Sequence, residues 1–240
     1  MSTAQVAASV VSPLLLAAAC VYFSPFISAV WALILERGRI GLAMPGKTVI
    51  LITNLGPVPE VHVPFLDIPA AAPSPGIMFW TAVGTVVLGI ISVLLRGKLT
   101  PVAFFLRAVV LVQVTALIYF FFWPLSFPYG IDDYTIAEMT AGFGVIILVP
   151  LVLGLIFYPF DFSLTKKIGL ALIVTLHLGV LIPLQFTVHA YLIQKFSLLF
   201  MPVLFMLFGL LLEVTVGITL YGWGMSWAGR WEKSPLERVA

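Results

Sequence analysis

Two apolar runs decide the fold: IGLALIVTLHLGVLIPLQFTVHAY at residues 168–191 and FSLLFMPVLFMLFGLLLEVTVGITLYG at residues 196–222. Each run is close to the ~20 residues that an α-helix needs to cross the hydrocarbon core of a bilayer. The short segment between them, which includes Lys195, leaves room only for a tight connection. The sequence therefore predicts two membrane-spanning helices folded back on each other as a hairpin.

Most of the polar residues that the sequence places in the bilayer lie on this hairpin. The first helix carries His177, Gln185 and His189, and the second carries Glu213. At ~1.5 Å per residue, His177 and Glu213 each lie roughly 15 Å from the helix ends on one side, so they should lie at similar depth. An ionisable residue at that depth costs several kcal/mol unless a partner or water faces it. Either the pair hydrogen-bonds and locks the hairpin, or it carries a proton or a ligand.

The composition defines the class of protein. Hydrophobic residues make up 62% of the chain and charged residues 9%, and the mean hydropathy is +1.16. A soluble domain carries roughly a quarter charged residues, so we expect a polytopic membrane protein whose first partner is the lipid bilayer. The formal net charge of +2 comes without a basic patch, which argues against nucleic acid as a partner. The lone Cys20 excludes an intrachain disulfide and a CxxC redox site.

The remaining apolar runs extend the pattern to about six helices. The N-terminus has no basic n-region, and the run after it is too long for a signal-peptide core, so we expect a retained first span that Pro25 kinks. The predicted fold class is an all-α integral membrane protein in which residues 1–240 form a single polytopic domain. The predicted spans are 13–35, 77–95, 101–123, 136–158, 168–191 and 196–222.

Basic residues near the helix ends set the predicted orientation. With both termini in the cytoplasm, eight basic residues fall on the inner side, including those of a tail at 228–240, and four fall on the outer side. This imbalance favours a bacterial inner (plasma) membrane protein with both termini cytoplasmic. The outer set is Arg37, Arg39, Lys47 and Lys195, and the inner set is Arg96, Lys98, Arg107, Lys166, Lys167, Arg230, Lys233 and Arg238.

Residues 36–76 form the one sizeable extramembrane segment of this topology, a loop on the outer side. Residues 48–53 are mostly apolar or β-branched, and residues 58–65 alternate loosely between apolar and polar side chains, as strands do. The sequence NLGP at 54–57 between them consists of residues typical of a turn, so we predict a small β-hairpin. An isolated hairpin is marginal in water. It should therefore lie on the helix bundle or on a partner, and because it is apolar we favour a partner protein or the membrane surface as its support.

A second outer loop carries acidic residues and no basic ones. Asp132, Asp133 and Glu138 have the carboxylate oxygens that hard cations prefer. The alternative is helix capping, in which Asp133 or Thr135 is the N-cap of the fourth span and Glu138 lies in its first turn. The two interpretations differ in whether the acids face an ion or the solvent.

Motifs for known chemistry are lacking in the sequence. It has no Gly-rich phosphate loop, no HExxH and no GxSxG, and its three histidines are too few for a two-haem anchor. We therefore predict no catalytic residue, no metal-ligand set and no particular cofactor. Arg107 lies about six residues into the third span, where it either snorkels to the inner face or pairs with Glu213.

Two short strings resemble a known family. GLIFYP at 154–159, with GRW at 229–231, is similar to strings in the membrane A subunit of copper membrane monooxygenases. The resemblance implies a distant relationship to that subunit and assigns copper ligation to no residue. The acidic and aromatic loop that follows the first span of that family is absent here.

Three functions stay open on the sequence alone. The first is a non-catalytic subunit, a scaffold or anchor of a larger membrane complex, which docks on other membrane subunits through residues 36–76. The second is a small-solute or proton-coupled transporter that uses His177, Gln185 and Glu213. The third is an intramembrane enzyme that acts on a lipid or a quinone.

Overall fold

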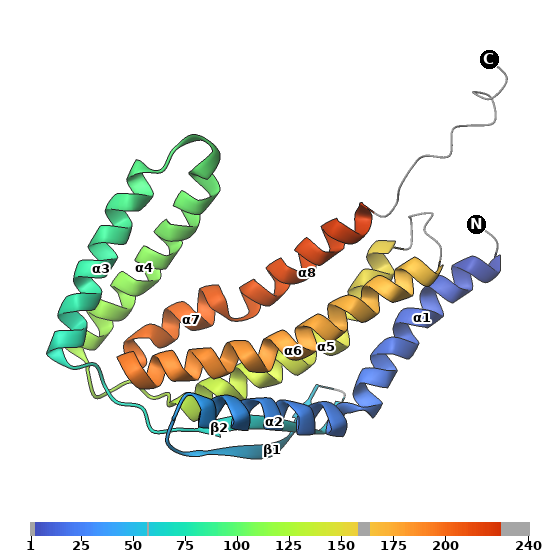
Figure 1. Cartoon of the computed structure of the whole chain (residues 1–240), viewed down its shortest axis with the longest axis horizontal. Coiled ribbons are helices and arrows are strands. Elements are labelled where there is room, and N and C mark those ends of the chain that lie inside the picture. Colours follow the sequence, from blue (N-terminus) through green and yellow to red (C-terminus); the bar gives the residue numbers. More distant parts are fainter. Residues whose placement is uncertain (1–2, 57, 158–163, 227–240) are drawn as a thin grey trace. The chain divides into compact units, whose positions relative to one another are not determined.

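In the computed structural model the chain is mostly helical (78%) and carries one small two-stranded antiparallel sheet (Figure 1). The structure describes residues 3–56, 58–157 and 164–226. The chain divides into two compact units. We call Met1–Tyr22, Val145–Gly179 and Glu213–Ala240 the terminal unit, and we call the rest, Phe23–Gly144 and Val180–Leu212, the central unit.

Among the described residues, five helices are long and apolar enough to cross a membrane, which indicates an integral membrane protein. A sixth crossing results if α1 (Thr3–Tyr22) and α2 (Ser24–Gly41), which meet at a bend, are counted as one span. The five are α3 (Pro75–Leu94), α4 (Thr100–Phe122), α5 (Ile131–Phe157), α6 (Leu164–Phe196) and the interrupted helix α7 (Met201–Phe208) plus α8 (Leu210–Met225). The 3-10 turns η1 (Gly97–Leu99) and η2 (Leu198–Phe200) precede α4 and α7.

These bounds refine the predicted spans at two places. The kink predicted at Pro25 is confirmed, because α1 ends at Tyr22 and Pro25 lies in the first turn of α2, where a missing N–H costs nothing. The helix α5 begins at Ile131, five residues before the fourth predicted span. The predicted tail at 228–240 and the strings at 158–159 and 229–231 lie outside the described residues.

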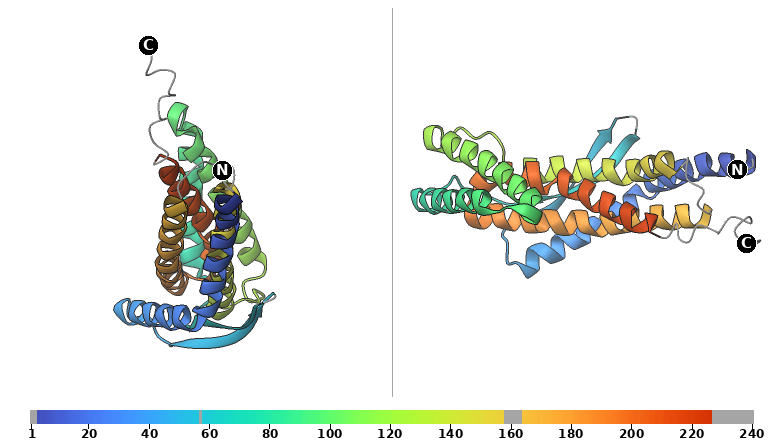
Figure 2. Two further views of the ribbon diagram at one scale, coloured as in Figure 1. Left: turned by 90° about the vertical axis from the view of Figure 1, so that its right-hand side faces the viewer. Right: turned by 90° about the horizontal axis from the view of Figure 1, so that it is seen from above.

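In the central unit, α2 packs beside a β-hairpin of β1 (Lys47–Leu55) and β2 (Val58–Asp67), as Figures 1 and 2 show. We call α2 and this hairpin the platform. The strands pair antiparallel from Lys47 with Asp67 to Leu55 with Val58. Gly56 takes a φ of 57° in the turn, a conformation that glycine adopts without strain. The predicted β-hairpin is confirmed.

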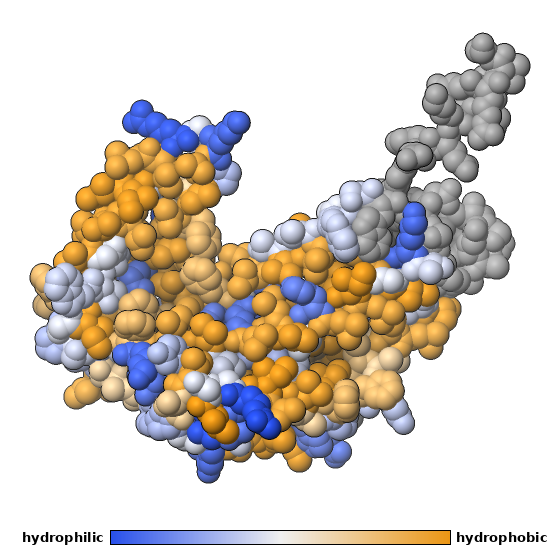
Figure 3. All heavy atoms as spheres, in the orientation of Figure 1, coloured by the Kyte–Doolittle hydropathy of each residue, from blue (hydrophilic) through white to orange (hydrophobic). Residues whose placement is uncertain are grey.

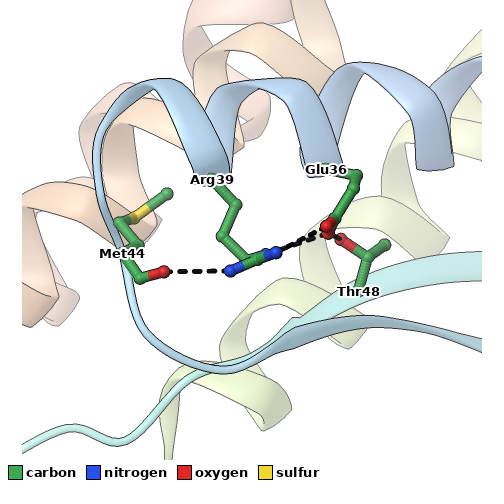
Figure 4. Close-up of polar contacts among 4 residues, drawn as sticks. All are labelled: Glu36, Arg39, Met44 and Thr48. Carbon is green, nitrogen blue, oxygen red and sulfur yellow. Dashed lines mark hydrogen bonds and ion pairs between the residues drawn. The ribbon is translucent and has the colours of Figure 1, made fainter.

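An ion pair within α2, between Arg39 and Glu36, is linked by two further hydrogen bonds to the following connection and to β1 of the hairpin (Figure 4). Arg39 donates its Nε to Glu36 at 2.9 Å, and its Nη1 to the carbonyl of Met44 at 3.1 Å. Thr48 of β1 donates its hydroxyl to the same carboxylate at 2.8 Å. The hydrogen bond from Arg39, followed by that from Thr48, lowers the pKa of Glu36 to about 2. Every carboxylate oxygen of this residue is thus hydrogen-bonded.

The platform rests on the helices of its own unit. Trp31 of α2 packs on Phe143 of α5, with ring centroids 4.3 Å apart. The backbone N–H of Leu66 in β2 donates to Thr135 Oγ1 of α5 at 3.3 Å. The hairpin therefore lies on helices of its own chain, which is one of the supports predicted from the sequence, while Ile50 and Ile52 of β1 remain exposed.

The helices α3 and α4 form a helical hairpin in the central unit. Ser74 caps α3 by accepting a hydrogen bond from the N–H of Ile77 at 3.3 Å, and Pro75 follows as the first helical residue. Most of the large apolar side chains of this pair are exposed. Figure 3 shows the resulting surface as almost continuously hydrophobic up to the hydrophilic turn between the helices. Such a surface suits contact with lipid or with another apolar helix.

In the terminal unit, glycines let helices approach each other closely. Pro13 of α1 lies so near Gly154 of α5 that a Cβ on the glycine would overlap the proline ring. Gly224 of α8 is related in the same way to Leu170 of α6. In a membrane the hydrophobic effect does not drive helices together, because lipid tails are as apolar as the helix surface. Helices therefore associate by close van der Waals packing, which small residues at the contact allow.

Candidate functional site: a helix break with buried polar residues

The last apolar helix is interrupted at Gly209, between α7 and α8. Gly209 has φ −86° and ψ −123°, outside the helical region, so the carbonyl of Phe208 lacks its usual partner in the helix. Gln185 of α6 replaces that partner, with its Nε2 donating to the Phe208 oxygen at 2.5 Å. Counted from Leu198 at ~1.5 Å per residue, the break lies about 17 Å from the start of this 27-residue apolar segment, close to its middle.

Glu138 of α5 packs against the break. Its side chain is 3% exposed, and a Cβ built on Gly209 would collide with its carboxylate Oε1. Position 209 therefore accepts glycine alone without displacing the acid. We call Glu138, Gln185, Phe208 and Gly209 the helix-break cluster.

A second polar pair lies one helical turn from the cluster. Tyr134 precedes Glu138 by four residues on α5, and His189 follows Gln185 by four residues on α6, so each pair shares one face of its helix. Tyr134 Oη and His189 Nδ1 are 2.7 Å apart, and both side chains are buried. The facing sides of α5 and α6 thus carry polar side chains on two successive helical turns, Tyr134 with His189 on one and Glu138 with Gln185 on the next.

Glu213 is the most deeply buried acid among the described residues. It belongs to the terminal unit and lies in the first turn of α8, four residues after Gly209 in the chain. Its side chain is 1% exposed, and neither carboxylate oxygen has a hydrogen-bond partner in the part of the chain that the structure describes. A buried polar group without a partner is costly, so native proteins keep one only for a reason.

The predicted pairing of His177 with Glu213 is wrong. The side chain of His177 is exposed, and Glu213 accepts no hydrogen bond from any described residue. The neighbours Val174 and Leu178 occupy the buried face of α6 instead. Helix length gives the depth of a residue but not the direction in which its side chain points around the helix axis.

Arg107 interacts with α3 and with its own helix. It donates its Nη2 to the carbonyl of Ser92 at 3.3 Å, and its guanidinium lies 5.2 Å from the ring centroid of Phe104. The side chain is exposed. The alternative in which Arg107 pairs with Glu213 is therefore not what the structure shows.

The three acids predicted for the outer loop have separate roles. Asp133 accepts the backbone N–H of Gly130 at 3.0 Å and so caps α5 from within its first turn, while Asp132 is half-buried beside it. Thr135 lies inside the helix, where it donates to the carbonyl of Ile131, so neither predicted N-cap residue is the N-cap. Glu138 is buried in the second turn instead of solvated in the first. Among the described residues, no group of three or more His, Cys, Asp and Glu could hold a metal ion.

Two parts of the site are not predicted from the sequence. Tyr134 lies among the acids assigned to the second outer loop, and Gly209 lies inside the predicted span 196–222, which the sequence predicts as one continuous helix. The spacing of Tyr134 to Glu138 and of Gln185 to His189 is the signal that predicts two facing polar stripes. The break at Gly209 has no comparable signal, because its partners come from two other helices.

Comparisons with protein-family models, with curated proteins and with solved structures find no match for this chain. The function is therefore inferred from the residues and their geometry.

Proposed function

We propose that this chain is a membrane carrier for a small solute, coupled to protons, and that the helix-break cluster is its binding site. The observation that carries the proposal is the interruption of the last apolar helix at Gly209, with Gln185 on the freed carbonyl and Glu138 buried beside it. Interrupted helices near mid-membrane are a recurrent device of secondary transporters, because the broken backbone offers carbonyls and helix ends to a ligand.

The buried acids favour a binding role over a purely structural one. An ionisable residue inside a membrane is expensive and usually marks a substrate, ion or proton pathway. A structural polar network stabilises a fold only when its members are satisfied. The carboxylate oxygens of Glu213 have no hydrogen-bond partner among the described residues. The free-energy cost of burying this acid is explained if it binds a proton or a ligand during function.

The proposed topology has six crossings, the first made by the bent α1–α2 pair, with both termini in the cytoplasm of a bacterium and the β-hairpin of the platform outside. The eight inner and four outer basic residues support it. Under this topology Tyr134 and His189 lie between the helix-break cluster and the outer medium, because α5 begins and α6 ends on the outer side. A membrane-impermeant maleimide should label K47C but not K98C in intact cells of a Cys20→Ser background, and the reverse pattern would invert the topology.

Proton movement in proteoliposomes tests the carrier function. Purified protein is reconstituted in vesicles that contain a pH-sensitive dye, and amino acids, sugars and carboxylates are added outside one class at a time. We expect one class to drive proton movement in the wild type and Gln185→Leu to abolish it. The matched control is Gln113→Leu, because Gln113 is also buried and donates its amide to a backbone carbonyl, that of Leu199 at 3.3 Å. Equal loss in both variants, or no response to any class, would contradict the proposal.

The α3–α4 pair favours a second function, that of a subunit in a larger membrane complex. Its apolar side chains are mostly exposed, and a Cβ on Gly84 would meet no atom within 4 Å, so a partner helix has room to approach there. Purification in mild detergent distinguishes the two. Stoichiometric partner proteins would support the subunit, whereas a partner-free monomer that moves protons in liposomes would exclude it.

A further inference from the structure

We infer that Glu213 is the residue that binds and releases the coupled proton; this rests on the proposed carrier function. Three observations meet at this residue. Its carboxyl is 1% exposed, its two oxygens have no hydrogen-bond partner in the described structure, and it follows the helix break by one turn. No other acid among the described residues combines these properties.

Two opposing effects make both protonation states of Glu213 reachable. Burial in an apolar span favours the neutral acid, because an ionised carboxylate loses its hydration there. The first turn of α8 favours the carboxylate, because the free backbone N–H groups at a helix N-terminus carry partial positive charge. A break in the helix thus supplies, inside the membrane, the helix end that stabilises the charged form.

A proton fits the site better than a metal cation does. Ca²⁺ and Mg²⁺ take about six or more oxygen ligands, which are drawn from several side chains, carbonyls and waters. The two oxygens of Glu213 meet no hydroxyl, amide or second carboxylate at hydrogen-bonding distance within the described residues. A proton needs only one carboxyl oxygen.

The titratable neighbours of the terminal unit do not compensate Glu213. Among the described residues they are Cys20 and Tyr22 on α1, His177, Lys166 and Lys167 on α6, and Tyr221 on α8 itself, whereas the part of α5 in this unit carries none. None of them hydrogen-bonds to Glu213 in the described structure. We therefore expect the proton of Glu213 to come from water or from a ligand, because no described side chain of its unit donates one to it.

An apolar carbodiimide tests this inference directly. Dicyclohexylcarbodiimide enters the membrane and adds to a protonated carboxyl: the acid proton moves to a reagent nitrogen, the carboxyl oxygen bonds to the central carbon, and the adduct rearranges to a stable N-acylurea. We expect peptide mass spectrometry of the reconstituted wild-type protein to find this adduct on Glu213 at neutral pH. Labelling should fall roughly tenfold for each pH unit above the midpoint of the titration.

The controls separate this inference from the proposed function. Asp133, which is exposed, should stay unlabelled, and Glu213→Gln should lose the adduct at position 213 while keeping the thermal stability of the wild type. No adduct at Glu213 at any pH, or labelling that does not depend on pH, would overturn the inference even if solute-driven proton movement occurs. Labelling of Glu213 without any such movement would instead uphold the proton site and remove the carrier function.

Discussion

Glu36 in the platform accepts hydrogen bonds from Arg39 and Thr48, whereas Glu213 in α8 has no hydrogen-bond partner among the described residues. The first acid lies near the end of α2, and both of its carboxylate oxygens are hydrogen-bonded (Figure 4). The second lies in an apolar span and is almost completely buried. A hydrogen-bonded acid contributes to the stability of a fold, while an unsatisfied acid buried in an apolar helix lowers it and is for that reason a candidate for a functional role.

The largest effect should come from Gly209→Ala. Its methyl group would meet the Glu138 carboxylate, so we expect a loss of about 1–3 kcal/mol of stability, typical of an overpacked interior, and loss of proton movement. Gly217→Ala is the control, because a Cβ there meets nothing within 4 Å and alanine favours a helix. Thermal melts in one detergent and flux in proteoliposomes measure both. Equal behaviour of the two variants would show that the break tolerates a side chain.

Tyr134→Phe should have an intermediate effect. It removes the hydroxyl that lies 2.7 Å from His189 Nδ1, and a buried hydrogen bond of this kind contributes about 0.5–1.5 kcal/mol. If the solute passes Tyr134 and His189 on its way from the outer medium to the helix-break cluster, the flux should fall as well. Tyr119→Phe, which loses an exposed hydrogen bond to the carbonyl of Ser126, is the control and should change neither quantity.

Glu36→Gln should destabilise the platform slightly and in a pH-dependent way. Because the pKa of Glu36 is lowered from 4.5 to about 2 by Arg39 and Thr48, the carboxylate stabilises the fold above pH 4.5 and loses that contribution as the pH falls toward 2. The difference in melting temperature between wild type and variant should therefore be present at neutral pH and shrink over that window. Asp67→Asn, whose ion pair with Lys47 is long and exposed, should show no difference at either pH. A gap that widens on acidification would refute this account of the pair.

The smallest effect should come from His177→Ala. The side chain is exposed, so its loss should leave stability unchanged, and combining it with Glu213→Gln should give the sum of the single effects to within ~0.5 kcal/mol. A double-mutant cycle by thermal melting checks this. A coupling well above that limit would restore the pairing that the structure does not contain.

The sequence predicts those features that depend on local chemistry. Asn54 to Gly56 marks the turn of the hairpin, Pro25 marks the bend after α1, and apolar length marks the spans. It does not predict features that depend on other helices. The helix is interrupted at Gly209, where Gln185 hydrogen-bonds to the freed carbonyl and Glu138 packs against the glycine. Both of these residues lie far from Gly209 in the sequence. His177 shows a related limit, since hydrophobic depth carries no information about which way a side chain faces in so apolar a helix.

The most direct measurement compares solute-driven proton movement in proteoliposomes that contain wild-type protein, Glu213→Gln or Glu36→Gln at equal density. Both variants exchange one glutamate for its neutral isostere, one in an apolar span and one in the platform. If the buried acid is functional and the paired one structural, Glu213→Gln abolishes the movement and Glu36→Gln retains it. Proton movement that survives Glu213→Gln, or that Glu36→Gln abolishes in folded protein, would contradict the account.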